Sequence, residues 1–146
     1  MNIIIRRAVQ HDFAGVHELI KEFAVFQKTP EKVSISLQQM INEQDKIHCI
    51  IAEADHSEIV GFATYFSAYY SWTGRAIYLD DLYVKPSFRN AQVGKNLLDA
   101  VINIAKEEQC IKVRWQVSKW NENAIGFYKK MGALVDETEI NCDLYL

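Results

Sequence analysis

Proline, glycine and cysteine are all scarce in this chain of 146 residues, which contains 2 prolines, 6 glycines and 3 cysteines. So few prolines and glycines leave no room for a long flexible linker, and the length suits one domain over residues 1–146. Cys49, Cys110 and Cys142 form no closely spaced pair, which disfavours a zinc site or a redox pair and is typical of a reducing cytosol. The histidines also lack ligand spacing, so no metal site is expected.

Excess basic charge and long apolar runs are missing as well. The 16 lysines and arginines are outnumbered by 19 acidic residues, whereas nucleic acids and anionic membranes attract basic surfaces. No apolar run approaches the ~18 residues that cross a membrane. The first residues place charges after a short apolar run, which reverses the order of a signal peptide. We therefore expect a cytoplasmic globular protein with neither a nucleic-acid partner nor a membrane partner.

The hydrophobic periodicity predicts an α/β fold with a mixed sheet. Antiparallel strands come first and β-α-β crossovers follow, an order that places helices on both faces of the sheet. We expect strands at residues 3–5, 47–54, 59–70, 76–84 and 112–117, with one or two more closing the chain through residues 144–146. Helices are expected after an Asp12 cap as far as Phe26, from Ser36 to Ile41, from Gly94 to Ala105, and between an Asn121 cap and Gly132.

The segment over residues 78–95 is the most informative for function, because a strand leads into a loop that opens a helix. Free backbone N–H groups and the positive end of the helix dipole then point at one spot, which suits an anion. No acidic residue occurs between Leu82 and Leu98, while Lys85, Arg89 and Lys95 add positive charge. These features are typical of a phosphate-binding loop, although spacing alone fits an ordinary turn with solvated basic residues equally well.

The pattern Val84-x-Pro86-x-x-Arg89-x-x-x-x-Gly94 resembles the acetyl-CoA pyrophosphate loop of the GNAT superfamily of N-acetyltransferases. The usual loop is Arg/Gln-x-x-Gly-x-Gly/Ala; here Gln92 stands at the first glycine, and Asn90 stands where glycine is common. Asparagine adopts left-handed geometry more readily than glutamine does. The resemblance implies a GNAT-like acyl-CoA N-acyltransferase fold with a central mixed sheet of six to seven strands, helices on both faces, and acetyl-CoA as co-substrate.

The resemblance extends from about Ile5 to Ala133, and its details look like the spermidine/spermine (diamine) N-acetyltransferase branch. Members of this branch pair as dimers, so a homodimer is implied. The segments that carry the similarity are Leu19-Ile20-Lys21-Glu22-x-Ala24, Val60-Gly61-Phe62-Ala63, Tyr65-Phe66, Trp72-x-Gly74, Tyr78-Leu79-x-Asp81, Trp120-Asn121-Glu122 and Asn123-x-x-x-Phe127-Tyr128-Lys129-x-x-Gly132-Ala133.

The resemblance also implies which residues would contact the co-substrate. Backbone amides late in the strand would hold the pantetheine and polarise the thioester carbonyl, often at a bulge. The loop would hold the pyrophosphate, and the start of the last helix would contact the far side of the cofactor arm. The implied residues are Leu82, Tyr83 and Val84; Arg89, Asn90, Ala91, Gln92, Val93, Gly94 and Lys95; and Asn121 and Ala124.

Acetyl transfer to an amine requires that the ammonium lose a proton, that the developing oxyanion meet hydrogen-bond donors, and that the leaving thiolate be protonated or stabilised. A phenol, with a pKa near 10, can donate a proton to a thiolate. The resemblance assigns this role of general acid to Tyr128, although a core position beside Phe127 explains that residue as well. No cysteine stands beside a plausible base in the sequence, so direct attack in a ternary complex is expected.

Asp80 and Asp81 lie within a predicted strand, where alternation places them on opposite faces. An acid in an apolar strand must be solvated or paired, so one of them should face a cleft. The resemblance places an amine-binding and deprotonating acid at Asp80; a surface acid at a strand edge is the alternative. Substrate-side positions implied by the resemblance are Phe26, Gln27, Asp80, Arg114, Trp115 and Gln116.

Three departures from the diamine branch bear on the substrate. Asp80 replaces a glutamate, Gln27 replaces an acid, and the C-terminal acid and tryptophan positions fall near Ile140 and Cys142. A single-amine substrate, such as a lysine-like or thialysine-like amino acid, therefore rivals a polyamine. An aromatic stretch could line an amine pocket through cation–π contacts, but its alternating spacing favours positions in the protein core and at a subunit interface. It comprises Tyr65, Phe66, Tyr69, Tyr70 and Trp72.

Three functional hypotheses follow from the sequence. The first is a small-amine N-acetyltransferase that uses acetyl-CoA. The second is a catalytically weak acyl-CoA-binding module, which is suggested by Gln92 and the short Asp80. The third is an acetyltransferase that acts on a protein N-terminus or lysine.

Overall fold

The computed structural model describes residues 2–89 and 91–146. The chain divides into two compact units, Met1–Trp115 and Gln116–Leu146, which are described separately below. None of the described helices is long and apolar enough to cross a membrane.

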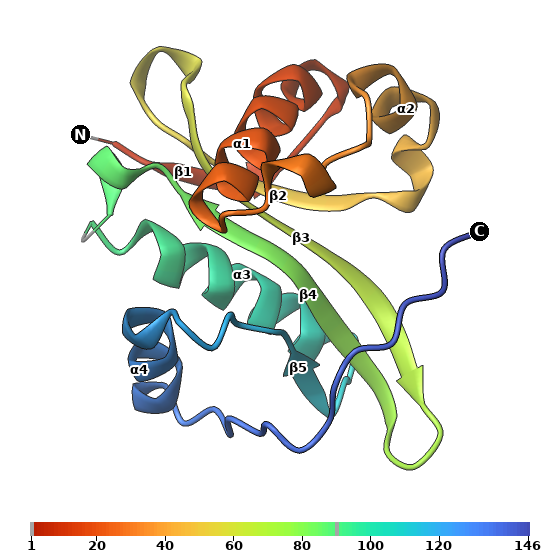
Figure 1. Cartoon of the computed structure of the whole chain (residues 1–146). Helices are drawn as coiled ribbons and strands as arrows, with labels where there is room; N and C mark the ends of the chain where they lie inside the picture. The colour runs from red at the N-terminus through yellow and green to blue at the C-terminus, as the bar shows by residue number, and fades with distance from the viewer. Residues whose placement is uncertain (1, 90) are drawn as a thin grey trace. The chain divides into compact units, whose positions relative to one another are not determined.

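The first unit is built on a mixed five-stranded sheet in the order β1-β2-β3-β4-β5 (Figure 1). The first four strands pair antiparallel, and β5 pairs parallel with β4. Figure 1 shows α1 and α2 on one side of this sheet and α3 on the other. The predicted α/β class is therefore confirmed. The bounds are β1 (Ile4–Arg7), β2 (His48–Glu53), β3 (Ile59–Tyr70), β4 (Gly74–Val84), β5 (Lys112–Arg114), α1 (Phe13–Phe26), α2 (Leu37–Asn42) and α3 (Val93–Glu107).

Helix α1 covers one face of the sheet with apolar residues spaced three apart. Phe13, Val16 and Leu19 are buried and belong to the same cluster as Ile51 and Phe62 of the sheet. Each fully buried side chain of this size contributes roughly 1.5–3 kcal/mol. Spacing of three to four residues is what sequence periodicity detects, and the predicted helix ends at Phe26 as expected.

Helix α3 packs on the opposite face, where the backbone of β3 comes close to it. A Cβ atom on Gly61 would lie 3.2 Å from Leu97 and 3.0 Å from the carbonyl of Tyr83. Leu97, Leu98 and Val101 are completely buried. This packing fixes the position of the first turn of α3 relative to the end of β4, the region that the sequence marks for anion binding.

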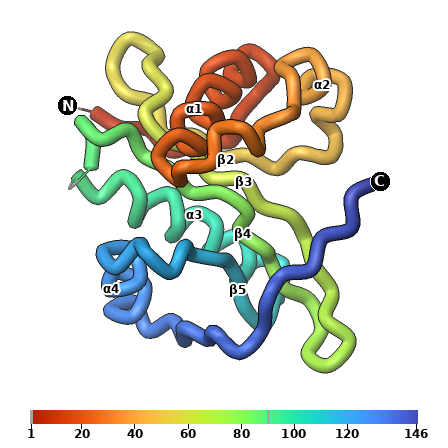
Figure 2. The backbone as a smooth tube through the Cα atoms, in the orientation of Figure 1, coloured from red at the N-terminus to blue at the C-terminus, as the bar shows by residue number. Residues whose placement is uncertain are grey.

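The second unit contains α4 (Glu122–Lys130) followed by a segment without regular secondary structure (Figure 2). The Asn121 side chain accepts a hydrogen bond from the Ala124 N–H at 3.3 Å, as expected for an N-cap. Gly132 has a φ of 94°, and the N–H groups of Gly132 and Ala133 donate to Lys129 and Tyr128. This hydrogen-bond pattern is a Schellman motif, so the predicted glycine C-cap is confirmed.

Several sequence expectations are wrong in detail. The described residues form five strands rather than six or seven, because the segment after Gly132, including residues 144–146, has no strand partner. The strand predicted at 112–117 ends at Arg114. Asp12 does not cap α1 with its side chain, because its carboxylate is bound by Arg6 and by the Val9 N–H.

Candidate functional site

A β-bulge lies in β4 where the two adjacent acids occur. Thr64 of β3 pairs with Asp81 and Tyr65 pairs with Leu79, so Asp80 is an extra residue without a cross-strand partner. Simple alternation therefore does not assign a face to Asp80. Its side chain is exposed, whereas Asp81 is only partly accessible.

Asp81 points to the face of the sheet that α1 and α2 cover. Its cross-strand partner Thr64 pairs in turn with Cys49, which belongs to the core cluster under α1. Burial, reinforced by the neighbouring Asp80 charge, raises the pKa of Asp81 to about 7. Partial burial also raises the pKa of Asp80. Both carboxyl groups are thus shifted toward the range in which they can exchange a proton near neutral pH.

Cys49 is not a candidate nucleophile. Burial, followed in size by the Asp12 and Asp81 charges, raises the pKa of its thiol to about 12. The thiolate is the reactive form of cysteine, so this side chain behaves as a small hydrophobic residue. Cys110 is partly accessible and Cys142 exposed, and all three cysteines are free.

The edge of β4 that faces β5 is open along its second half. Pairing with β5 is limited to Ala76, Ile77 and Tyr78, which lie opposite Lys112, Val113 and Arg114. From Leu79 to Val84, no β5 residue in the described part of the chain continues the ladder. Backbone groups of β4 that point to this edge can therefore bind an extended ligand. The resemblance implies this role for Leu82, Tyr83 and Val84; Leu82 and Val84 face the open edge, whereas the backbone of Tyr83 faces its partner Phe62 in β3.

The loop after β4 enters α3 through a left-handed residue. Gln92 has φ 61° and ψ 16°, the geometry that glycine adopts without strain, and the sequence resemblance marks this position as a glycine of the pyrophosphate loop. The N–H groups of Val93, Gly94 and Lys95 belong to the first helical turn, where no intrahelical acceptor is available. They and the helix dipole favour an anion at this end.

Side chains around this loop differ in how they meet solvent. Val93 is buried, Ala91 is exposed, and Lys95 forms an ion pair with Asp99 at 2.7 Å along the helix surface. A Cβ atom on Gly94 would meet only Val84, at an ordinary 3.6 Å. The predicted loop residue Asn90 lies outside the described residues.

The guanidinium of Arg89 lies against α1. Its Nε donates to the carbonyl of Val84 at 3.0 Å, and its Cζ lies 4.8 Å from the Phe26 ring and 5.4 Å from the Tyr83 ring. The structure thus brings a predicted cofactor residue and a predicted substrate residue, Phe26, into contact. Gln27 follows as the C-cap of α1.

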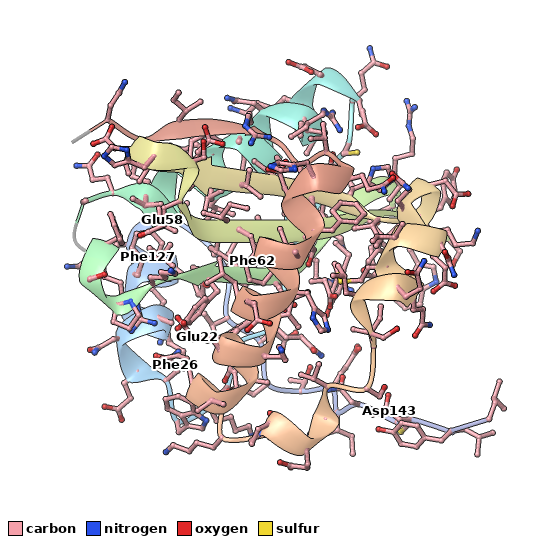
Figure 3. The ribbon with its side chains drawn as sticks, turned by 90° about the horizontal axis from the view of Figure 1, so that it is seen from above. Glu22, Phe26, Glu58, Phe62, Phe127 and Asp143 are labelled. Atoms are coloured by element: carbon pink, nitrogen blue, oxygen red, sulfur yellow. The ribbon has the colours of Figure 1, made fainter. Side chains whose placement is uncertain are left out.

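Glu22 is a residue of this region that sequence reasoning did not assign to the site. Its carboxylate accepts a hydrogen bond of 2.6 Å from the Tyr83 hydroxyl. Burial, together with this bond, raises the pKa of Tyr83 to about 12. The sequence contained one indication that Glu22 belongs to the site. Glu22 lies four residues before the predicted substrate residue Phe26 on α1, and Figure 3 shows both residues on one side of the helix.

The far end of the sheet carries a cationic and aromatic cluster. Tyr70 lies beneath both Lys112 and Arg114, with ring-centre distances of 4.5 Å and 4.7 Å. Tyr65 is buried, in agreement with the core interpretation of the aromatic stretch, whereas Trp72 is 97% exposed. Trp115, the remaining predicted substrate residue of the first unit, directly follows β5.

The second unit holds Tyr128 in the last turn of α4. Burial raises the pKa of its phenol above the ordinary value near 10, and the hydroxyl, which is protonated at neutral pH, can act as a donor. The ring is tilted against Phe127 at a centroid distance of 5.6 Å. Gln116, a predicted substrate residue, donates to the Asn141 side chain at 2.7 Å within this same unit.

Within residues 2–89 and 91–146, no group of three or more His, Cys, Asp or Glu side chains could hold a metal ion. The expectation of no metal site remains a prediction.

Comparisons with known proteins agree on one family. Residues 13–133 match the Acetyltransferase (GNAT) family. The thialysine N-epsilon-acetyltransferase of Sus scrofa is 33% identical over 143 residues, covering 90% of this chain and 84% of that protein. The human spermidine/spermine N(1)-acetyltransferase-like protein 1 is 30% identical over 140 residues, which are 89% of this chain and 20% of that protein. A crystal structure of a Trypanosoma brucei acetyltransferase shares the fold, with a TM-score of 0.79 at 23% identity over 98% of this chain and all of that one (100%).

Proposed function

Because this chain belongs to the acetyltransferase (GNAT) family, on its diamine-type branch, we propose that it moves the acetyl group of acetyl-CoA to a primary amine of a small molecule. The observation that carries this proposal is the combination of an open β4 edge after Tyr78 with a left-handed Gln92 at the start of α3. The first feature suits an extended pantetheine arm, and the second suits a diphosphate.

The residues of this chain fit the co-substrate through backbone groups more than through side chains. The N–H groups of Leu82 and Val84, which point to the open edge of β4, would hold the pantetheine and polarise the thioester carbonyl, while the N–H of Tyr83 between them points to β3. The N–H groups of Val93, Gly94 and Lys95 would hold the pyrophosphate. Packing does not require a glycine at position 94, since a Cβ atom there would meet Val84 at an ordinary 3.6 Å. The missing side chain would instead let the pyrophosphate approach the backbone N–H groups. Asn121 and Ala124 would contact the cofactor arm.

The acceptor amine would meet the adjacent acids of β4. Asp80 would bind the ammonium and take its proton through water, a role supported by its exposure and raised pKa. The free amine would then attack the acetyl carbon in a ternary complex. The new C–N bond forms as the C–S bond breaks, and Tyr128 would give its proton to the leaving thiolate. The proton that the nitrogen loses as it becomes an amide would return, through water, to the Tyr128 phenolate.

A lysine-like amino acid fits the site better than a long polyamine. Gln27 is neutral where the diamine branch has an acid, so a second ammonium of the substrate would lack a partner there. Arg114, with its guanidinium over Tyr70, offers a cation for a substrate carboxylate. Phe26, Trp115 and Gln116 complete the proposed acceptor residues. The name of the Sus scrofa relative supports an amino-acid substrate.

An assay with a panel of amines tests the proposal. Acetyl-CoA is incubated with lysine, thialysine, ornithine, spermidine and a peptide library, free thiol is measured, and each product is identified by mass. We expect turnover on free amino acids that carry a side-chain amine. Thermal stabilisation by acetyl-CoA without turnover would instead favour the acyl-CoA-binding module. Transfer only to peptides would favour a protein acetyltransferase.

Three further proposals accompany this function. We propose that residues 1–146 act as one domain, that the protein works in the cytoplasm, and that it forms a homodimer. The exposed aromatic side chains of β3, Phe66 at 46% and Tyr69 at 77% exposed, support a contact surface. The absence of nucleic-acid and membrane partners remains a prediction.

A further inference from the structure

Glu22 of α1 makes a contact that differs from that of an ordinary surface acid. Its exposed carboxylate accepts a hydrogen bond of 2.6 Å from the Tyr83 hydroxyl of β4, 61 residues away in the sequence. That length is typical of a charge-assisted O–H···O⁻ bond. The preceding turn shows the ordinary arrangement, in which Lys21 pairs with Glu18 along the helix at 2.8 Å. Glu22 instead joins the second half of α1 to the end of β4.

The Tyr83 side chain is held both at its ring and at its hydroxyl. Tyr83 is 4% exposed, and its ring stacks on Phe23 at a centroid distance of 5.1 Å, with Phe26 tilted against it at 6.2 Å. A tyrosine hydroxyl in a buried position needs a hydrogen-bond partner, and Glu22 supplies it. The bond to Glu22 therefore fixes the orientation of the ring.

The Tyr83 ring is one of two rings beside the Arg89 guanidinium. The Cζ atom of Arg89 lies 5.4 Å from the centre of this ring and 4.8 Å from that of Phe26, which follows Glu22 by one turn of α1 (Figure 3). Burial and the hydrogen bond to Glu22 raise the pKa of Tyr83, whereas the Arg89 charge lowers it. Glu22 and Arg89 thus act on the same hydroxyl with opposite sign.

Arg89 in turn fixes the start of the loop that leads to the left-handed Gln92. Its Nε donates to the Val84 carbonyl at 3.0 Å. The Lys85 N–H donates to Val60 of β3, so the backbone of Val84 faces the open edge of β4. The bond from Arg89 therefore covers a carbonyl oxygen that would otherwise repel an anion at this edge.

We propose that Glu22 is a positioning residue for acetyl-CoA binding, an inference that rests on the proposed acetyl-CoA chemistry. Through the Tyr83 hydroxyl, Glu22 fixes the ring on which Arg89 lies. Through Arg89, it fixes the loop that places the first N–H groups of α3 around the pyrophosphate. Glu22 acts without contacting the co-substrate, and what it contributes is an oxygen that accepts the hydrogen bond.

Calorimetric titration of the whole chain with acetyl-CoA tests this role. Glu22→Ala removes the acceptor and should weaken binding about threefold to fivefold, and Tyr83→Phe, which keeps the ring, should do the same. Glu22→Gln keeps an oxygen acceptor and should bind within about twofold of the wild type. Glu18→Ala removes an exposed acid one turn earlier on α1 and should bind as the wild type does. In steady-state kinetics the loss should appear in KM and not in kcat.

A double-mutant cycle separates positioning from packing. If Glu22 acts through Arg89, the double variant Glu22→Ala, Arg89→Ala should bind acetyl-CoA as Arg89→Ala alone does. Losses of affinity that multiply would show that Glu22 acts independently of Arg89 and would overturn the proposal. A purely structural role is the other contrary outcome: Glu22→Ala would then lose stability in urea and keep its affinity. Glu22→Gln as weak as Glu22→Ala would exclude the route through the hydrogen bond.

Failure of this inference and failure of the proposed function give different results. A wild-type protein that binds acetyl-CoA no better than Glu22→Ala does overturns the positioning role alone. A wild-type protein that does not bind acetyl-CoA overturns both. Should Glu22→Ala fail to fold, Tyr83→Phe alone and combined with Arg89→Ala decides by the same criteria.

Discussion

The guanidinium of Arg89 lies 4.8 Å from the ring of Phe26, so the loop before α3 is attached to the last turn of α1. The same guanidinium donates to Val84 at the end of β4. The side chain of Arg89 therefore connects α1 with the end of β4 and the loop that follows β4. Because its guanidinium binds Val84 and Phe26, Arg89 holds the loop before α3 in position. The backbone N–H groups at the start of α3, and not Arg89, would then bind the anion.

Replacement of Arg89 by alanine should raise the KM for acetyl-CoA about tenfold with a smaller change in kcat. The expectation follows from the loss of a charge-assisted hydrogen bond and of exposed cation–π contacts, together roughly 1–2 kcal/mol. Arg89→Lys should recover little of the lost acetyl-CoA affinity, since a lysine ammonium cannot donate to the Val84 carbonyl and stack on the Phe26 ring at the same time. Steady-state kinetics measure the effect, and Arg75→Ala, at an exposed position of β4, is the control. An unchanged KM in Arg89→Ala would show that the loop needs no such attachment.

Replacement of Gln92 by glycine should stabilise the fold and tighten acetyl-CoA binding. A left-handed residue other than glycine costs about 1–2 kcal/mol, part of which is offset by the greater freedom of glycine in the unfolded chain, so a gain of up to about 1 kcal/mol is expected. Gln109, at the other end of α3, has a φ of 59° and is a matched control.

The control separates stability from binding. Urea denaturation should show a gain for both Gln92→Gly and Gln109→Gly, because both relieve backbone strain. Calorimetric titration with acetyl-CoA should show tighter binding only for Gln92→Gly. If both variants gain stability and neither changes the affinity, the left-handed turn does not approach the pyrophosphate.

Features that depend on neighbouring residues could be predicted from the sequence. The spacing of Phe13, Val16 and Leu19 identified the buried side of α1, and the Asn121 cap and Gly132 terminus of α4 follow from local hydrogen bonding. The left-handed position at 92 was marked by the resemblance of the loop, because glycine is usual there.

Features that depend on long-range pairing could not be predicted. The resemblance implied a bulge late in this strand, but its position at Asp80 arises from the register between β3 and β4, which the sequence of β4 does not contain. Asp12 suits a helix cap by type, but Arg6 lies within 2.8 Å and takes its carboxylate. A closing strand at residues 144–146 was expected from apolar content, yet a strand also needs a neighbour to pair with.

Replacement of Tyr128 by phenylalanine should lower kcat by roughly 100-fold, the usual size of a general-acid contribution, and leave acetyl-CoA affinity unchanged. The reason is that the Tyr128 phenol is protonated at neutral pH and can donate to the thiolate, whereas phenylalanine has no proton to give. Burial raises the pKa of Tyr128, which makes it a weaker acid than a free phenol. Stopped assays of free thiol measure kcat, and calorimetry measures binding. Tyr145→Phe removes a hydroxyl from an exposed tyrosine of the same unit and should have wild-type activity. A Tyr128→Phe enzyme as fast as the wild type would exclude the phenol as proton donor.

Asp81 should make the stability of the protein depend on pH in the direction opposite to most carboxylates. Its pKa is about 7 in the folded protein and about 3.9 in an unfolded chain. Between these values the folded state binds more protons, so the free energy of unfolding decreases as the pH rises from about 4 to about 7 and then levels off.

Asp81→Asn should remove this dependence, because the amide stays neutral at every pH. At pH 8 the variant should be more stable than the wild type by roughly 2–4 kcal/mol, with 4 as the upper bound that three pKa units allow. At pH 4 the two proteins should be nearly equal. Urea denaturation across this range measures the difference between variant and wild type, which cancels the other titrating groups, and Glu31→Gln at an exposed position should follow the wild type. A constant difference from pH 4 to pH 8 would mean that Asp81 is ionised throughout and that its burial is relieved by water, in which case Asp81 could not exchange a proton with an amine near neutral pH.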